Sequence, residues 1–593
     1  MKNMYLPSRR FTLAITVLAG AMWLGRPVAA APEYHPIDST NEDMTVTITG
    51  YDLTIEQVVQ VARHGAMVGL SDAAKERQAD IYALLNEAAA EGVPIYGFNR
   101  RWGFLRDQVR FTGDPRSPEN RETLEQQALA SYQGGQHYGE GPEIDREDVV
   151  RAIMLVYLSQ RTFRAASPES TQLLIDMLNN RVTPVMQSRG GTGQAQGPAS
   201  ANIHAAMVGQ GEAYYRGVRM AASAALREAG LKPFRPHPSD AALGATNADV
   251  AGMSALLVHD ARRLLDWVDL TYAIDLNGLN SSLSPLFLPV QNNRPYPWNN
   301  WVSRRVLNML RGSYLFEMDP NRIIQDPESM RAGYVREGAA WRAWKWLHDD
   351  VVIQMNRSDG NPAQVANVRP EDSWELSTPW AMHYYVEGTT SDRGTHGFVF
   401  SNANWDPYPL GNSLEAFTIA LANLDILVLM RQERFENTFH TRAEAHEVLG
   451  WDDDGGGIPR IWNSNHESWQ RIQGWINPVP PEGYSSDPPY VQDLDAETLF
   501  KVERAVKVVR ESWKLVANDL LSGARWMDVR KVQDPSRSFG PAPTAAVAAL
   551  RQVVPLAPRQ RSLGPETPTE KAIRFIQTTP ATNFITDDPP RPD

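Results

Sequence analysis

The sequence contains no cysteine among its 593 residues. Disulfide bridges, thiolate metal sites and a cysteine nucleophile are therefore excluded. It also lacks an excess of basic charge, because 58 Lys and Arg side chains stand against 70 Asp and Glu side chains, a net charge of −12. Nucleic-acid binding requires a basic surface, so we expect no nucleic acid as the main partner. The 12 histidines show no metal-binding spacing such as HExxH, and we expect no metal site.

The N-terminus carries an apolar run that is too short for a membrane-spanning helix. Residues 11–24 follow Arg9 and Arg10, and a run of this length does not span a bilayer comfortably. The small residues up to Ala30 suit a signal peptidase, and the arginine pair resembles a twin-arginine export signal. We expect residues 1–30 to be a signal peptide, the protein to be periplasmic or secreted, and no stable membrane insertion after its removal. An N-terminal membrane anchor is the alternative.

The rest of the chain is mostly helical in its pattern. Alternating Thr, Val and Ile residues predict a short strand over residues 45–49. A stretch rich in Ala, Leu, Glu and Gln predicts a helix over residues 72–90, ended by the glycine that follows. Apolar residues recur at spacings of three and four in residues 414–430 and 502–521, which predicts two long helices. The fold class is therefore mainly α, a long helical bundle with a small N-terminal mixed region.

Changes in composition divide the chain into four parts. The first two are the signal peptide and a polar linker over residues 31–45. A helical domain follows over residues 46–540. Residues 541–593 are rich in proline and are predicted to form a C-terminal tail that wraps the surface or is mobile.

Several short sequence motifs follow one another along the helical domain. They are Pro94-Ile95-Tyr96-Gly97-Phe98-Asn99, Val182-Thr183-Pro184-Val185, Gly209-Gln210-Gly211-Glu212-Ala213 and Gln325-Asp326-Pro327-Glu328-Ser329-Met330-Arg331. Through these motifs, which occur in the same order, the chain resembles the histidine and phenylalanine ammonia-lyases over roughly residues 45–535. The last motif is the most specific. The resemblance implies a fold of long helices, a small anionic substrate and a homotetramer whose active sites are shared between subunits.

One departure from the family concerns its electrophile. These lyases build methylidene-imidazolone by cyclising an internal Ala-Ser-Gly triplet, and the matching positions here hold Gln194, Ala195 and Gln196. There is no serine to dehydrate and no glycine for the tight backbone attack. We therefore expect no imidazolone and no other cofactor. Thr192 or Ser200 could carry the electrophile only with compensating insertions and deletions.

The resemblance also implies the chemistry of three side chains. Tyr96 matches the family's catalytic base. Arg331 matches the arginine that holds the substrate carboxylate, and its planar fork suits bidentate pairing. Glu328 stands where the family has a second tyrosine, so a carboxyl group is expected to replace a phenol as acid or base. The alternatives are a packing tyrosine, a structural ion pair and a solvated surface acid, respectively.

Further residues are expected to bind the substrate. They are Gln325, Asn247, Gln492, Tyr132, Trp405, Arg100 and Arg101. Tyr132 occupies the family's selectivity position for the ring, and Trp405 replaces a pocket phenylalanine that suits stacking. Arg100 and Arg101 follow Tyr96 where the family has small residues, and we expect them to lower the pKa of that tyrosine and to favour a second anionic group on the substrate. The amides and Trp405 could equally be core residues.

Retention of an anchor and a base without the electrophile favours repurposing over decay. The sequence predicts an exported ammonia-lyase-like enzyme that eliminates an amine or water, or isomerises, an anionic aromatic or cyclic substrate without imidazolone. Tyr96 is its expected base and Arg331 its carboxylate anchor. Two alternatives stay open: a conventional aromatic amino acid or histidine ammonia-lyase with a shifted electrophile, and a non-catalytic periplasmic binding protein on this fold.

Overall fold

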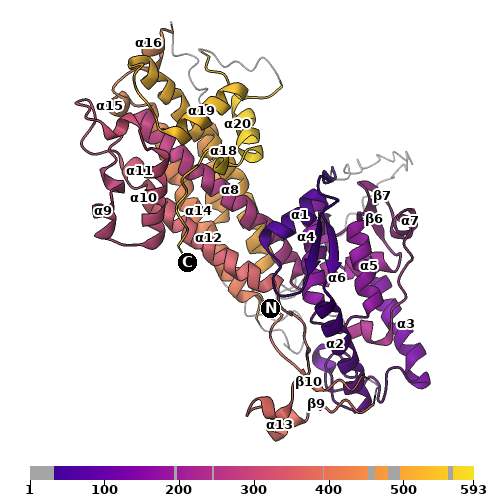
Figure 1. Cartoon of the computed structure of the whole chain (residues 1–593). Helices are drawn as coiled ribbons and strands as arrows, with labels where there is room; N and C mark the ends of the chain where they lie inside the picture. Colours follow the sequence, from indigo (N-terminus) through magenta and orange to yellow (C-terminus); the bar gives the residue numbers. More distant parts are fainter. Residues whose placement is uncertain are drawn as a thin grey trace, which may run out of the picture.

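The computed structural model describes residues 33–191, 197–242, 246–390, 393–451, 461–478, 494–557 and 565–592 (Figure 1). The predicted signal peptide, Gln492 and the triplet position at residues 194–196 lie outside the described residues.

Four long helices form the core of a helical bundle. They are α8 (Ala248–Leu279), α12 (Gly333–Met355), α14 (Tyr408–Phe435) and α18 (Thr498–Gln533), and they pack against one another (Figure 1). The helices predicted over residues 414–430 and 502–521 lie within α14 and α18 and are confirmed. The stripe that predicted α14, including Leu414, Phe417 and Leu421, is buried against its neighbours, and this burial of apolar surface stabilises the bundle.

Helix α14 is long and apolar enough to cross a membrane by length and composition alone. Of the apolar window that meets this criterion, 61% is buried inside the fold. That degree of burial is typical of a core helix in a large protein.

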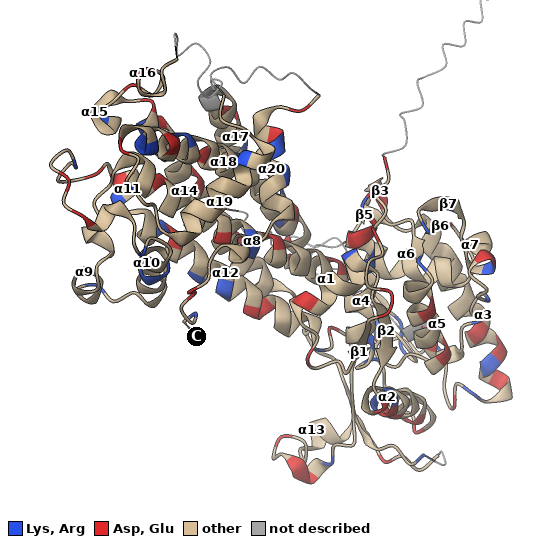
Figure 2. Cartoon of the chain, turned by 45° about the horizontal axis from the view of Figure 1, so that its top comes forward, with Lys and Arg blue, Asp and Glu red and all other residues tan. Residues whose placement is uncertain are grey.

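Shorter helices surround this core. They are α9 (Leu288–Asn292), α10 (Pro297–Met309), α11 (Glu328–Arg331), α15 (Thr438–Thr441), α16 (Ala445–Leu449) and α17 (Ile461–Trp475). Acidic and basic residues are interspersed along the helices (Figure 2).

The N-terminal region mixes helices with short strands, as predicted. The strand expected over residues 45–49 is β1 (Thr45–Ile48), which pairs in parallel with β2 (Met67–Leu70) across the helix α1 (Ile55–His64). Thr54 and Gln57 form a capping box at the start of α1, and Gly65 ends it with a φ of 74° that favours glycine.

Two further small sheets belong to this region. One has the order β4 (Val182–Pro184), β6 (Glu212–Tyr215), β7 (Val218–Ala221), and the other pairs β3 (Glu140–Glu143) with β5 (Gln187–Arg189). Its helices are α2 (Asp72–Ala90), α3 (Pro118–Gly134), α4 (Glu147–Arg161), α5 (Pro168–Asn179), α6 (Gly197–Met207) and α7 (Ala222–Glu228). Helix α2 has the bounds that its composition predicted.

An arm projects from the helical domain and packs against α2 (Figures 1 and 2). It consists of the antiparallel strands β8 (Ala363–Ala366), β10 (Gly397–Phe400) and β9 (Tyr385–Val386) with the short helix α13 (Pro379–Met382). Val386 and Val399 of the arm share an apolar cluster with Ile95 and Phe98, the residues on either side of Tyr96-Gly97. The arm therefore supports the loop that carries the predicted base.

Both ends of the described chain are held to the body. In the segment predicted as a linker, Ile37 donates its backbone N–H to the Glu147 carboxylate at 3.0 Å, and Tyr34 stacks on Tyr214. The region predicted as a proline-rich tail contains two helices, α19 (Pro541–Val553) and α20 (Pro568–Thr578). Each begins with proline in its first turn, where the missing N–H is tolerated, so proline content alone did not reveal these helices.

Candidate active site

Tyr96 lies in a loop that is held by hydrogen bonds from the loop's own side chains. The amide of Asn99 accepts from Ile95 N at 2.7 Å and donates to Val93 O at 2.8 Å, which folds the chain back just after α2. The half-buried phenol of Tyr96 accepts a hydrogen bond from Gly103 N at 3.1 Å. Trp102 packs edge-on against its ring at a centroid distance of 5.2 Å. Trp102 and Gly103 are site residues that sequence reasoning missed.

The expected influence of Arg100 and Arg101 on the Tyr96 phenol stays a prediction. Arg100 donates to its neighbour's carbonyl, Asn99 O, at 3.4 Å, and Arg101 is exposed. Within the described residues, no recorded hydrogen bond joins either guanidinium to Tyr96. The contact to its oxygen comes instead from a backbone N–H, which spacing along the sequence cannot reveal.

Tyr132 is buried inside the N-terminal region. Its ring stacks on the imidazole of His204 in α6 at a centroid distance of 4.2 Å, and its hydroxyl has no partner within the described residues. Burial, with the nearby Asp240 carboxylate, raises the pKa of Tyr132 well above its usual value. His204 in turn contacts the Tyr157 hydroxyl at 2.9 Å, and burial lowers its pKa. A single histidine on an apolar helix gave no sequence signal for this stack.

Two predicted substrate-binding residues meet at the start of α8. Asn247, fully buried, donates from its side-chain amide to the backbone carbonyl of Trp405, which precedes α14. Its backbone N–H donates to Asp359 at 2.7 Å, and Thr246 donates to the same carboxylate oxygen at 2.7 Å. The side-chain amide oxygen of Asn247, Oδ1, is buried and has no hydrogen-bond partner within the described residues. It is therefore available as a hydrogen-bond acceptor.

Gln325, Glu328 and Arg331 lie together on and before α11. The first two are exposed, whereas Arg331 is half-buried. Its Nε is buried without a hydrogen-bond partner, and no carboxylate of the described residues lies within ion-pair distance of it. The structural ion pair that was the alternative for Arg331 is thus not found in the described part of the chain.

A cavity of about 470 Å³ lies beside residues that flank the triplet position in the sequence. Its lining includes Ser188 and Arg189 before that position and Pro198 and Ala199 after it. The first turns of α4, α6, α8 and α18 all contribute to its walls. The lining carries four acidic side chains, those of Glu143, Asp145, Asp249 and Glu503, and four basic side chains, those of Arg146, Arg189, Lys507 and Arg510.

Asp249 of α8 also lines this cavity and is 8% exposed. Burial raises the pKa of its carboxyl well above its usual range. The cavity therefore contains a carboxyl group that retains its proton more readily than a surface acid does. Nothing in the local sequence distinguished Asp249 from an ordinary acid in the first turn of a helix.

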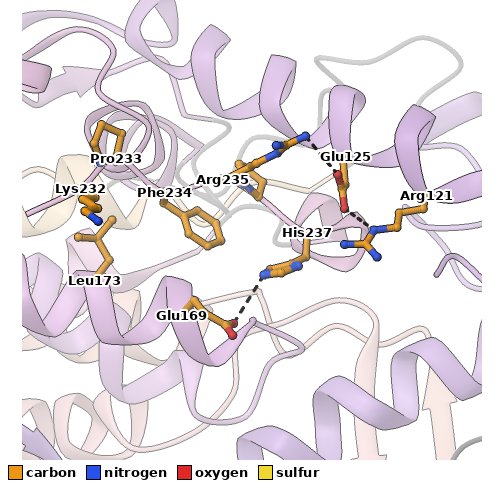
Figure 3. Close-up of a pocket in the computed structure, with 10 residues that line it drawn as sticks. Arg121, Glu125, Glu169, Leu173, Lys232, Pro233, Phe234, Arg235 and His237 are labelled. Atoms are coloured by element: carbon orange, nitrogen blue, oxygen red, sulfur yellow. Dashed lines mark hydrogen bonds and ion pairs between the residues drawn. The ribbon is translucent and has the colours of Figure 1, made fainter.

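A second pocket, of about 500 Å³, lies outside the predicted site (Figure 3). His237 faces Glu169 at 3.7 Å, and Glu125 faces both Arg121 at 2.8 Å and Arg235 at 3.7 Å. Lys232 also lines the pocket, so three basic side chains, including Arg121 and Arg235, stand against the two carboxylates of Glu125 and Glu169.

One chain does not bring all the predicted residues together. Helix α11, with Arg331, lies at the opposite end of the molecule from α2 and α3, which flank Tyr96 and carry Tyr132 (Figure 1). Among the predicted residues that the structure describes, Asn247 and Trp405 are joined by a hydrogen bond. Within the described residues, no group of three or more His, Asp or Glu side chains could hold a metal ion.

Comparison with known proteins relates the whole helical domain to one family. The family described as aromatic amino acid lyase matches residues 53–552. Histidine ammonia-lyase from Treponema denticola is 33% identical over 322 residues, which is 54% of this chain and 61% of that enzyme. Histidine ammonia-lyase from Natranaerobius thermophilus is 24% identical over 531 residues, 88% of this chain and 96% of that enzyme.

Solved structures share the fold. Ergothionase from Treponema denticola, described as an ergothioneine degrading enzyme in complex with desmethyl-ergothioneine sulfonic acid, superimposes with a TM-score of 0.74 at 22% identity. The alignment covers 90% of this chain and 99% of that one. Histidine ammonia-lyase from Trypanosoma cruzi gives a TM-score of 0.74 at 18% identity, covering 92% of this chain and 96% of that one. From the family match and the fold, the chain belongs to the aromatic amino acid lyases.

Proposed function

We propose that this family member is an exported lyase that works without methylidene-imidazolone on an anionic aromatic or cyclic substrate. It eliminates an amine or water, or isomerises the substrate, with Tyr96 as base and Arg331 as carboxylate anchor. The observation that carries the proposal is the state of Arg331. Arg331 is half-buried with a buried, unpartnered Nε, and its charge reaches the Asp326 carboxyl without an ion pair to any carboxylate of the described residues. Such a guanidinium is suited to an anion from outside.

The residues at the triplet position support a route without the electrophile. Gln194, Ala195 and Gln196 do not fit the imidazolone, because the ring requires a serine that loses water and a glycine whose backbone nitrogen attacks. Ammonia leaves poorly without such help, and each tenfold loss in rate corresponds to about 1.4 kcal/mol of barrier. The substrate of this chain must therefore carry a better leaving group or a more acidic proton.

We propose a substituted amine as the leaving group by analogy with the ergothionase, while the curated relatives compared above are named histidine ammonia-lyase. Ergothioneine, the compound that the Treponema denticola ergothionase degrades, is a trimethylammonium betaine of a histidine derivative. Its C–N bond can break to release a neutral amine without a proton donor. Histidine and ergothioneine both combine a flat five-membered ring with a carboxylate, which matches an arginine anchor and an aromatic pocket.

The proposed base is placed to accept a proton. In the step, the Tyr96 oxygen takes the β-proton, the electron pair forms the carbon–carbon double bond, and the leaving group departs with the electrons of its bond. The Gly103 N–H that donates to this oxygen would stabilise the negative charge of a phenolate. Trp102 shields one edge of the ring from water.

The active site requires more than one subunit in this proposal. Tyr96 and Arg331 occupy distant parts of one chain, and two apolar side chains near Arg331 are almost fully exposed: Met318 at 97% and Ile324 at 99%. Burial of such residues against another copy is energetically favourable. We propose a homotetramer in which α11 of one copy completes the site of another.

The test is turnover by the purified mature protein. Histidine, phenylalanine, their N-trimethylated forms, ergothioneine and aromatic hydroxy acids are offered, and new conjugated double bonds are followed by ultraviolet absorbance while released amine is quantified. We expect turnover of a trimethylated or hydroxy acid and its loss in Tyr96→Phe. Full activity of Tyr96→Phe would contradict the assigned base, and saturable binding without any turnover would favour the binding-protein alternative.

Intact mass distinguishes the conventional ammonia-lyase from this proposal. Formation of an imidazolone at Thr192 or Ser200 removes two water molecules from the mature chain. We expect the unmodified mass beginning after residue 30, which would also support export with cleavage of the signal peptide. Detection of the mature protein in the periplasmic or extracellular fraction tests its location.

A further inference from the structure

Arg331 stands on an element that cannot hold its position alone. Helix α11 has four residues, Glu328–Arg331, and Glu328 is exposed to solvent. A single helical turn is only marginally stable in water. A carboxylate anchor must nevertheless hold its guanidinium within a fraction of an ångström of the productive position. Contacts beneath α11 therefore decide where Arg331 lies.

Two buried side chains bind consecutive backbone carbonyls of α11. Tyr272 of α8 donates its hydroxyl to Met330 O at 2.6 Å, and Arg431 of α14 donates its Nε to Ser329 O at 3.2 Å. The two donors also hold each other, because the Arg431 guanidinium lies over the Tyr272 ring at 4.2 Å from its centroid. Tyr272 is 1% exposed and Arg431 is fully buried. The bond to Met330 O is therefore shielded from water, and the bond to Ser329 O is part-buried.

The chain after α11 is shaped to sit directly on this pair. A Cβ atom at Gly333, the first residue of α12, would lie 2.5 Å from Tyr272 Cζ and 2.6 Å from Arg431 Nη2. Only glycine allows so close an approach without a shift of the backbone or of the two side chains. The junction between α11 and α12 is thus fixed on both sides of Arg331.

Arg431 keeps its charge in this buried setting. Burial alone would lower its pKa, but three neighbouring carboxyl groups outweigh the burial and raise it. These groups belong to Glu337, which forms an ion pair with Arg431, and to Asp519 and Asp275. A charged donor gives a stronger hydrogen bond to a carbonyl than a neutral donor does.

We propose that Tyr272 and Arg431 are positioning residues for Arg331, which fix the carbonyls of Met330 and Ser329 so that the anchor meets the substrate carboxylate. This inference rests on the proposed role of Arg331. Neither residue touches the substrate. Both act through the backbone on which Arg331 stands.

The experiment compares two buried tyrosines of equal chemistry. Tyr314 donates its hydroxyl to a backbone carbonyl at 2.6 Å, as Tyr272 does, but its acceptor is Asn277 O in α8. Tyr314→Phe is therefore the matched control for Tyr272→Phe, and Arg431→Lys tests the second donor. Amide hydrogen exchange of residues 328–332 is measured in the full chain, together with the affinity for trans-cinnamate as a simple aromatic carboxylate.

We expect amide exchange in α11 to be about fivefold faster, and trans-cinnamate affinity about fivefold weaker, in Tyr272→Phe but not in Tyr314→Phe, because one hydrogen bond is lost beneath the anchor. Unchanged α11 exchange in Tyr272→Phe overturns the inference, and so does an equal effect of both tyrosine variants. Arg331→Lys separates the two proposals. If Arg331→Lys leaves trans-cinnamate binding intact, Arg331 is not the carboxylate anchor. Amide exchange in Tyr272→Phe then still shows whether Tyr272 positions α11.

Discussion

The side-chain amide of Asn247 donates a hydrogen bond to the backbone carbonyl of Trp405. These residues are 158 positions apart in the chain, and both were predicted to bind substrate. The bond fixes the first turn of α8 to the segment that precedes α14. Trp405 is thereby held in place by its backbone as well as by its indole, which donates to Asn402 O at 2.9 Å.

Removal of this bond should destabilise the protein. In Asn247→Ala the Trp405 carbonyl loses this part-buried hydrogen bond, and we expect a loss of about 0.5–1.5 kcal/mol in the free energy of unfolding. The exposed Asn423→Ala is the control and should change stability little, because within the described residues its amide donates within its own helix at 2.9 Å and otherwise accepts only from Arg336 at 3.5 Å. Urea denaturation followed by tryptophan fluorescence measures both. Equal stabilities of the two variants would contradict the assigned role.

Asp425 should make stability depend on pH. Burial raises the pKa of its carboxyl from 3.8 to about 8, against a single opposing hydrogen bond from Ser512. Between about pH 4 and pH 8 the folded protein therefore keeps a proton that the unfolded chain releases. The free energy of unfolding falls as pH rises through this range, by up to about 1.4 kcal/mol per pH unit. Asp425→Asn should abolish this pH dependence, so the stability of the variant relative to the wild type should be greater at pH 8 than at pH 5.

The control for this pH effect is the exposed Asp107→Asn. Denaturation midpoints of the wild type and both variants are compared between pH 5 and pH 8. A pH slope that is identical in the wild type and in Asp425→Asn would show that this carboxyl does not titrate as described.

Glu91 should hold the arm against α2. Its carboxylate accepts three consecutive backbone N–H groups of the arm, from Glu387 and Gly388 at 2.8 Å and from Thr389 at 3.0 Å. We expect Glu91→Ala to speed amide exchange over residues 385–390 and to cost about 1.5–3 kcal/mol, typical of a hydrogen bond to a charged group. The exposed Glu122→Ala on α3 should do neither, and protected arm amides in Glu91→Ala would refute the contact's importance.

Shared active sites predict complementation between inactive variants. If Tyr96 and Arg331 of one site come from different subunits, Tyr96→Phe and Arg331→Lys subunits co-expressed in one cell will form some sites with both residues intact. We expect activity to return in the mixed tetramers and to be absent from either variant alone. Co-expression of Tyr96→Phe with Tyr96→Ala is the control. Failure to complement, with both variants present in one assembly, argues for sites within single chains.

Much of the fold was predictable because periodicity reports burial. Helix α2 and the cores of α14 and α18 follow directly from apolar spacing and from helix stop signals. The arm did not, because its strands are two to four residues long and are paired across long stretches of chain. Helices α19 and α20 were not predicted because the proline-rich composition of this region indicated a tail, whereas Pro541 and Pro568 lie in the first turns of these helices.

Site residues were predictable only where they belong to a local sequence motif. Tyr96 and Arg331 belong to such motifs, whereas the residues that hold them in place are remote in sequence. Arg431 is 102 residues from the carbonyl that it binds, and no local pattern reports a contact of that range. The expected influence of Arg100 and Arg101 on Tyr96 stays a prediction. The hydrogen bond from Gly103 N to the Tyr96 oxygen was not predictable, because no local pattern reports such a contact.

The last residues of the chain close a cluster of tryptophans in the bundle. Arg591 lies over the Trp341 ring at 4.8 Å, Asp588 pairs with the buried Arg305 at 3.0 Å, and Trp301 donates to Pro589 O at 2.9 Å. Residues 588–591 are therefore a structural part of the bundle, and their removal would leave the buried Arg305 and the Trp301 indole without these partners.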